Sequence, residues 1–149
     1  MVQTKVLFLC LHNSARSQIA EAYLKKYGGE IFEVESAGFS PSQINPLVVD
    51  VMKEEGIDIS TNKLKTVFAL FKEGYIFHYV IRVCDLAAKE QCPIFPSMAQ
   101  MIDWSFKDPS TFTGTYEEKL AQTRMVRDEI KEQIQSFIRT IRKSSSINS

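Results

Sequence analysis

The sequence has no excess of charge of either sign and no long hydrophobic run. Its 149 residues include 18 basic and 18 acidic side chains, so no global field favours nucleic acid or a membrane surface as a partner. No apolar run approaches the roughly 18 residues that a membrane span needs. The composition, 44% hydrophobic and 24% charged, is typical of a soluble globular protein, and the length suits one domain with a single core.

Cysteine and histidine are also scarce. Three cysteines, an odd number, argue against a disulfide framework and leave metal binding, catalysis or inert burial. There is no CxxC pair, seven residues separate Cys84 from Cys92, and the only histidines are His12 and His78, which disfavours a structural zinc site. The stretch 6–11 lacks the basic flank and cleavage site of a signal peptide, so we expect a cytoplasmic protein with reduced thiols.

Short buried strands alternate with amphipathic helices along the chain. Apolar runs predict strands at 5–9, 32–37, 79–83 and 100–104. Helical periodicity predicts helices from 17 to 27, from 46 to a Gly56 exit, around 66–71, and after 115. Because strands that alternate with helices form parallel sheets, we predict a single α/β domain over 1–142, a four-stranded parallel sheet flanked by helices.

The last predicted helix begins at a Thr115-x-x-Glu118 capping box. One apolar stripe along it consists of Leu120, Val126, Ile130, Ile134, Phe137 and Ile141. Its arginines, interleaved with acidic residues, predict a solvated face; they are Arg124, Arg127, Arg139 and Arg142. The polar residues 143–149 predict a disordered tail.

The chemistry of the chain concentrates in the loop between the first strand and the first helix. Cys10 and Arg16 bracket this loop, and the backbone N–H groups there, with a helix N-terminus, form an anion site. The predicted oxyanion-binding residues are Leu11, His12, Asn13, Ser14, Ala15 and Arg16. The same positive field is expected to lower the pKa of the Cys10 thiol, and Ser17 can donate a hydrogen bond to its sulfur. A buried structural cysteine beside a surface arginine is the alternative.

Several segments together resemble the low-molecular-weight protein tyrosine phosphatases and the related thiol-dependent arsenate reductases. They are VLFLCLHNSARSQIAEAYL, SAGFSP, MKEEGIDIS, VIRVCDLAAKEQCPIFP, WSFKDPS and VRDEI, which span nearly the whole chain. The arsenate reductase branch is closer, because it shares the SARSQIAE run and the cysteine pair. The aromatic residues that follow Asp-Pro in the phosphatases are missing here, since Ser110 and Thr111 follow Asp108-Pro109. The resemblance implies a low-molecular-weight phosphatase-like fold.

The resemblance also implies a role for each catalytic residue. Cys10 would attack arsenate, Arg16 and the loop amides would hold its oxygens, and Asp108 would protonate the departing oxygen. Cys84 would then attack the Cys10 adduct, and Cys92 would attack Cys84, which passes the disulfide outward. The alternatives are that Asp108 only forms a turn before proline, and that the two later cysteines are small buried apolar residues.

Some reductases of this type bind a potassium ion beside the loop. The matching residues here are Asn13, Glu21, Ser36 and, in place of an aspartate, Lys65. An ammonium group at that position would repel the cation or substitute for it. We therefore expect no metal.

These observations favour an arsenate reductase with no tightly bound cofactor, which an external thiol reductant such as thioredoxin restores. Its partners would be an arsenate-like or phosphate-like oxyanion and that reductant, with no nucleic acid and no membrane. The first alternative is a phosphatase that uses Cys10, Arg16 and Asp108, for which Cys84 and Cys92 would have no use. The second is an oxyanion or redox sensor without turnover.

Overall fold

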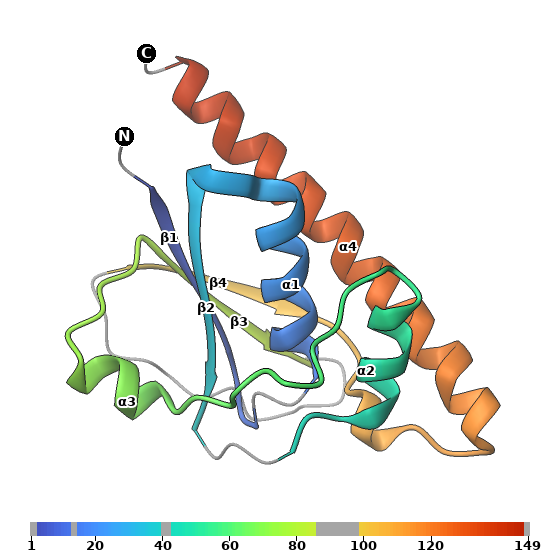
Figure 1. The fold of residues 1–149 in the computed structure, drawn as a ribbon. Helices are drawn as coiled ribbons and strands as arrows, with labels where there is room; N and C mark the ends of the chain where they lie inside the picture. The colour runs from blue at the N-terminus through green and yellow to red at the C-terminus, as the bar shows by residue number, and fades with distance from the viewer. Residues whose placement is uncertain (1–2, 13–14, 40–42, 86–98, 148–149) are drawn as a thin grey trace.

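The computed structural model describes residues 3–12, 15–39, 43–85 and 99–147, and it contains one four-stranded parallel sheet in the order β2-β1-β3-β4 (Figure 1). The strands are β1 (Thr4–Cys10), β2 (Phe32–Gly38), β3 (Tyr79–Cys84) and β4 (Gln100–Ser105). Every neighbouring pair is parallel. The predicted strands and the single-domain parallel sheet are confirmed, while the domain bounds 1–142 stay a prediction.

The four helices divide between the two faces of the sheet. They are α1 (Arg16–Gly28), α2 (Pro46–Lys53), α3 (Val67–Lys72) and α4 (Tyr116–Ile147), with short 3-10 turns η1 (Gly29–Ile31) and η2 (Pro109–Thr111). Figure 1 shows α1, α2 and α4 on one face and the shorter α3 on the other. The backbone of α4 runs into the range 143–149, and the disorder of that tail stays a prediction.

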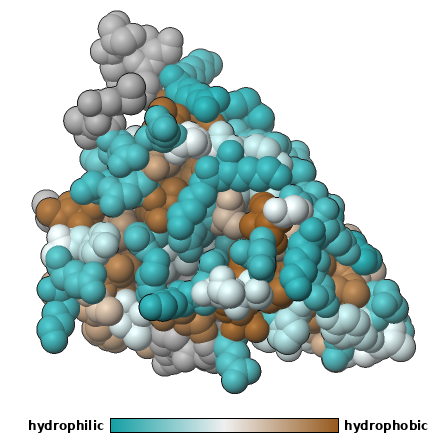
Figure 2. All heavy atoms as spheres, viewed as in Figure 1, coloured by the Kyte–Doolittle hydropathy of each residue, from teal (hydrophilic) through white to brown (hydrophobic). Residues whose placement is uncertain are grey.

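Burial along the strands follows from this layering. Val6, Leu7, Phe8 and Leu9 of the central strand β1 are all 0% exposed, because helices cover both faces of the sheet there. Alternate residues enter two cores: Phe8 packs with α1 and α4, whereas Leu7 and Leu9 pack with α3. Edge strand β4 buries only Trp104. Figure 2 shows hydrophilic side chains over most of the visible face, with apolar patches between them.

Side-chain caps fix where three of the helices begin. Asn45 accepts from the N–H of Leu47 (2.9 Å) in front of α2, and Thr66 accepts from the N–H of Ala69 (3.0 Å) in α3. The predicted capping box of α4 is present, since the Thr115 hydroxyl accepts from the N–H of Glu118 at 3.1 Å. Each cap accepts a hydrogen bond from an N–H group that has no acceptor within the helix, and so sets the helix boundary.

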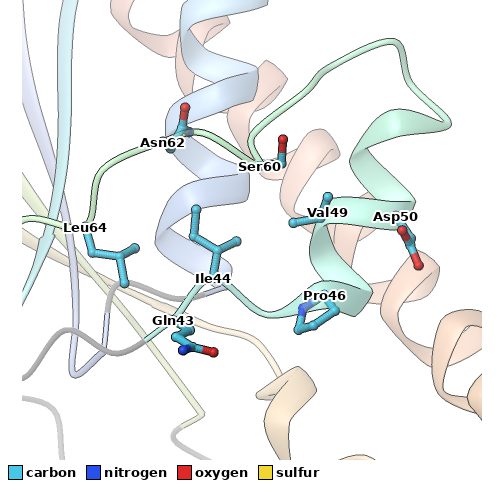
Figure 3. A pocket seen from close by; sticks show the side chains of 8 residues that line it. All are labelled: Gln43, Ile44, Pro46, Val49, Asp50, Ser60, Asn62 and Leu64. Carbon is cyan, nitrogen blue, oxygen red and sulfur yellow. The ribbon is translucent and has the colours of Figure 1, made fainter.

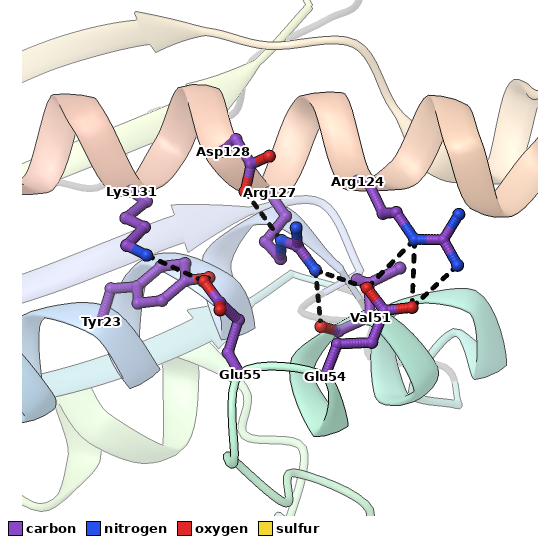
Figure 4. A network of polar contacts seen from close by, with 8 residues as sticks. All are labelled: Tyr23, Val51, Glu54, Glu55, Arg124, Arg127, Asp128 and Lys131. Carbon is purple, nitrogen blue, oxygen red and sulfur yellow. Dashed lines mark hydrogen bonds and ion pairs between the residues drawn. The ribbon is translucent and has the colours of Figure 1, made fainter.

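Ion pairs join α4 to the end of α2 (Figure 4). Arg124 and Arg127 both contact Glu54, at 2.8 Å in each case, and Arg127 also donates to the carbonyl of Val51. The prediction of a solvated face is wrong for Arg127, whose side chain is only 11% exposed because α2 packs beside α4, whereas Arg124 stays exposed while it pairs with Glu54. No helix in the described residues combines the length and the apolar character needed to cross a bilayer.

Candidate active site

The turn after β1 places Cys10 and Arg16 at the carboxyl edge of the sheet. Cys10 is the last residue of β1, where it lies opposite Gly38 of β2, and Arg16 is the first residue of α1. The N-terminus of a 13-residue helix therefore points at the loop. Its N–H groups and its dipole favour a bound anion at this position.

The structure describes four of the six residues predicted to bind an oxyanion. Leu11 is half-buried, His12 is exposed, and Ala15 is 4% exposed in front of the helix. Asn13 and Ser14 lie outside the described residues. The fourth described residue, Arg16, is itself buried, so its guanidinium lies within the protein rather than on its surface.

Cys10 is held in a buried polar setting. It is in the thiol form, only 5% exposed, and its Sγ lies 2.9 Å from the Oγ of Ser17, which is fully buried. When the sulfur is a thiolate, the hydroxyl donates this hydrogen bond. That bond and the helix N-terminus both stabilise the anionic form of the sulfur.

Arg16 and Asp108 come together although 91 residues lie between them in the sequence. The Nη2 of Arg16 lies 3.5 Å from the Oδ2 of Asp108. The other carboxylate oxygen, Oδ1, accepts from the N–H of Ser110 at 2.9 Å and caps η2. Asp108 therefore does form a turn, and its second oxygen also faces the arginine. The two interpretations of Asp108 are compatible.

The main chain of Phe106 also contacts this arginine, which sequence reasoning missed. Its carbonyl accepts from the Nη1 of Arg16 at 3.0 Å, and its N–H donates to the carbonyl of Cys84 at 2.9 Å. Both are backbone contacts, which leave no residue-type signal in a sequence. The ring is buried and lies edge-on to Trp104, with centroids 6.5 Å apart.

Cys84 ends β3, the strand next to β1, and so lies at the same edge of the sheet as Cys10. It is 1% exposed and disulfide-bonded. Cys92, the last of the predicted relay residues, lies outside the described residues. Two of the three cysteines are thus brought to the ends of neighbouring strands.

Three of the four residues that match the potassium site are described, and each has a polar partner; Asn13 lies outside the described residues. Glu21 accepts from Ser36 at 2.5 Å and from Lys25 at 2.8 Å, while Lys65 forms an ion pair with Glu35. Burial lowers the pKa of Lys65, but the hydrogen bond that Lys65 donates to Glu35 and the charges of Glu21 and Glu35 outweigh it and raise that pKa above 10.5. The ammonium group of Lys65, at a position where the potassium site would have an aspartate, does not suit a potassium ion. No metal-binding group of His, Cys, Asp or Glu occurs within the described part of the chain.

A groove of about 470 Å³ opens between α2 and the segment that follows it (Figure 3). Its lining residues are Gln43, Ile44, Pro46, Val49, Asp50, Ser60, Asn62 and Leu64. Asn62 also donates to the buried amide oxygen of Gln18, in the first turn of α1, at 3.0 Å. No cationic side chain is among these lining residues, so the groove is not itself an anion site.

Comparisons with known proteins agree with this geometry. The family model described as low molecular weight phosphotyrosine protein phosphatase matches residues 5–147. An arsenate reductase from Halalkalibacterium halodurans is 43% identical over 136 residues, which are 91% of this chain and 95% of that protein. A solved structure described as an arsenate reductase in the phosphate binding state has a TM-score of 0.72 at 29% identity, and covers 93% of this chain and 99% of that one.

A longer relative is the thioredoxin-dependent arsenate reductase of Corynebacterium glutamicum, with a TM-score of 0.67 and 29% identity. The match covers 97% of this chain and spans 64% of that protein. The predicted low-molecular-weight phosphatase-like fold is confirmed. Because the family model matches nearly the whole sequence, the chain belongs to the low molecular weight phosphotyrosine protein phosphatase family.

Proposed function

We propose that this protein is an arsenate reductase in which Cys10, Cys84 and Cys92 carry the electrons. The observation that supports this most is the placement of Cys10 and Cys84 at the ends of neighbouring parallel strands, at one edge of the sheet. A hydrolase needs only the first of these thiols. The relatives described as arsenate reductases, one of them 43% identical, point the same way.

The first step joins Cys10 to arsenic. The Cys10 thiolate attacks the arsenic atom, a sulfur–arsenic bond forms, and one arsenic–oxygen bond breaks. Arg16 and the amides of the loop hold the remaining oxygens, as a planar guanidinium suits two oxygens of such an anion. The carboxylic acid of Asp108 supplies the proton with which the departing oxygen leaves as water.

The second step reduces the arsenic. The thiolate of Cys84 attacks the sulfur of Cys10, so that a disulfide forms and the sulfur–arsenic bond breaks. The electron pair of that bond goes to arsenic, which falls from As(V) to As(III) and leaves as arsenite. The thiolate of Cys92 then attacks Cys84 and displaces Cys10 as a thiolate, through an in-line exchange.

The cycle closes when an external dithiol reduces the Cys84–Cys92 disulfide. A thioredoxin is the reductant we propose, because one of the structural relatives is described as thioredoxin-dependent. Such a cycle requires no tightly bound cofactor, and it requires a reducing compartment, so we place it in the cytoplasm.

A phosphatase is the second candidate, and membership of the phosphatase family favours it. The contacts of Cys10 with Ser17 and of Arg16 with Asp108 would serve a phosphoester as well as arsenate. In that reaction water, rather than Cys84, would attack the Cys10 adduct.

An activity comparison tests the proposal. Wild type and Cys84→Ser are each supplied with arsenate, thioredoxin and its reductase, and in parallel with an aryl phosphate. We expect arsenite from wild type alone, and any phosphate release to be equal in both proteins. Phosphoester hydrolysis without arsenite production would show that the protein is a phosphatase.

A further inference from the structure

The main chain of Phe106 connects two parts of the site that the proposed reaction uses at different times. Its carbonyl accepts from Arg16 (3.0 Å) and its N–H donates to Cys84 (2.9 Å). We propose that the Phe106 carbonyl is a positioning group that holds the Arg16 guanidinium in the orientation needed to bind the oxyanion. This inference rests on the proposed function only in taking Cys10 and Arg16 as the oxyanion site.

Arg16 needs such a support because its side chain is long and rotatable. An arginine that must lie in one orientation loses rotamer freedom, a cost that fixed partners reduce when they are in place before the ligand arrives. Arg16 is 5% exposed, and its Nη1 and Nη2 contact two different partners, Phe106 and Asp108. Contacts at both terminal nitrogens define the plane of the guanidinium.

The carbonyl can hold the arginine only if Phe106 is itself held. Phe106 directly follows β4, and its N–H is bonded to the last residue of β3. Its ring is 8% exposed and packs on Trp104. The Phe106 carbonyl is therefore fixed at the edge of the sheet, because both the main chain and the side chain of Phe106 are held in place.

A substitution of the Phe106 side chain would not test this proposal, because the contact with Arg16 is made by the backbone carbonyl. Replacing Lys107 by its α-hydroxy acid turns the 106–107 amide into an ester and makes the Phe106 carbonyl a weaker acceptor, while every side chain is kept. We expect the Kd for inorganic phosphate to rise about three- to tenfold, as when a charge-assisted hydrogen bond is weakened but not removed.

A matched control separates this effect from a general loss of stability. Replacing Tyr75 by its α-hydroxy acid removes the N–H that donates to the Leu70 carbonyl (3.1 Å) at the end of α3, on the other face of the sheet. This ester should lower the melting temperature without changing the Kd for phosphate. A 106–107 ester that lowers the melting temperature alone, with an unchanged Kd, would overturn the proposal.

A double-mutant cycle shows whether the ester acts through the arginine. Arg16→Lys weakens phosphate binding and removes the planar guanidinium, so in that background the ester should no longer change the Kd. An equal rise of the Kd in both backgrounds would contradict the positioning role. Because phosphate binding needs no turnover, a failure to reduce arsenate counts against the proposed function and leaves this result standing.

Discussion

Ser17 and Cys10 form the contact on which the proposed chemistry of the site depends. The two side chains are 2.9 Å apart and both are almost completely buried, so water cannot replace the hydroxyl as a donor to the sulfur without rearrangement. A donor to a buried thiolate stabilises the charged form over the neutral one. In the proposed reaction, the reactivity of Cys10 at neutral pH should therefore depend on this hydroxyl.

Ser17→Ala should raise the pKa of the Cys10 thiol by roughly one unit, as expected for the loss of a hydrogen bond to a charged group. The measurement is the pH dependence of Cys10 alkylation, with Cys84→Ser and Cys92→Ser present so that one thiol remains. Ser36→Ala is the control, because Ser36 is equally buried but donates to Glu21. Equal pKa values in the two variants would show that the hydroxyl does not act on Cys10.

Asp108→Asn should slow formation of the Cys10 adduct by about 10²- to 10⁴-fold, the usual contribution of a general acid. The asparagine oxygen can still accept from the N–H of Ser110, so the turn at η2 is kept. The control variant is Asp58→Asn, because Asp58 accepts from the N–H of Ser60, two residues later, at the same 2.9 Å. If both variants form the Cys10 adduct at the wild-type rate in a single turnover, Asp108 only forms a turn and is not a general acid.

At the scale of the elements, the pairing of α4 with the end of α2 has a definite pH dependence. Glu55 accepts from Lys131 at 2.9 Å and from the hydroxyl of Tyr23 at 3.0 Å, which together hold the pKa of Glu55 below 4.5 (Figure 4). Burial and the same hydrogen bond raise the pKa of Tyr23 above 10.0, so the phenol stays a neutral donor. A carboxylate with a depressed pKa stabilises the fold at neutral pH, and this contribution disappears as the pH falls through its folded value.

Glu55→Gln should therefore cost about 1 kcal/mol at pH 7, because it removes the charged partner of Lys131. The difference in melting temperature between the variant and wild type should shrink as the pH falls below 4.5, where wild-type Glu55 also becomes neutral. Thermal unfolding at several pH values measures this. The control is Glu129→Gln, at an exposed site on α4, which should have the melting temperature of wild type at every pH. If the melting temperature of Glu55→Gln stays equally far below that of wild type at low pH, the ion pair is not the cause.

The sequence predicted local structure well because the signals are local. The run from Val6 to Leu9, the Asn45-Pro46 start of α2 and the Thr115 capping box depend on neighbours within a few residues, and each is present. Contacts between distant segments carry no such signal. The pairing of Arg124 with Glu54 required knowledge of how α2 packs on α4.

The same reasoning applies to the candidate site. The loop from Cys10 to Arg16 was visible as a pattern, since a buried strand and an amphipathic helix enclose it. The Phe106 carbonyl was not, because any residue supplies the same backbone group. The resemblance indicated a role for Asp108, but only the fold shows that one of its oxygens faces Arg16 while the other caps a turn.

At the scale of the whole molecule, the parallel sheet brings distant cysteines to one edge. Strands β1 and β3 are neighbours although α1, β2, α2 and α3 lie between them in the chain, and each strand ends at a cysteine. A parallel arrangement aligns carboxyl ends, so Cys10 and Cys84 both lie at the edge of the sheet where ligands bind in such folds. The topology of the sheet therefore supports the proposed relay.

The most direct test of the account is to map the disulfides after a single turnover with arsenate. Wild type should end with Cys84 joined to Cys92 and Cys10 reduced, whereas Cys92→Ser should release about one arsenite per protein and stop at a Cys10–Cys84 disulfide. Cys84→Ser should release none. If arsenate leaves all three thiols reduced in the wild type, while a phosphoester is hydrolysed by all three proteins alike, the relay does not exist.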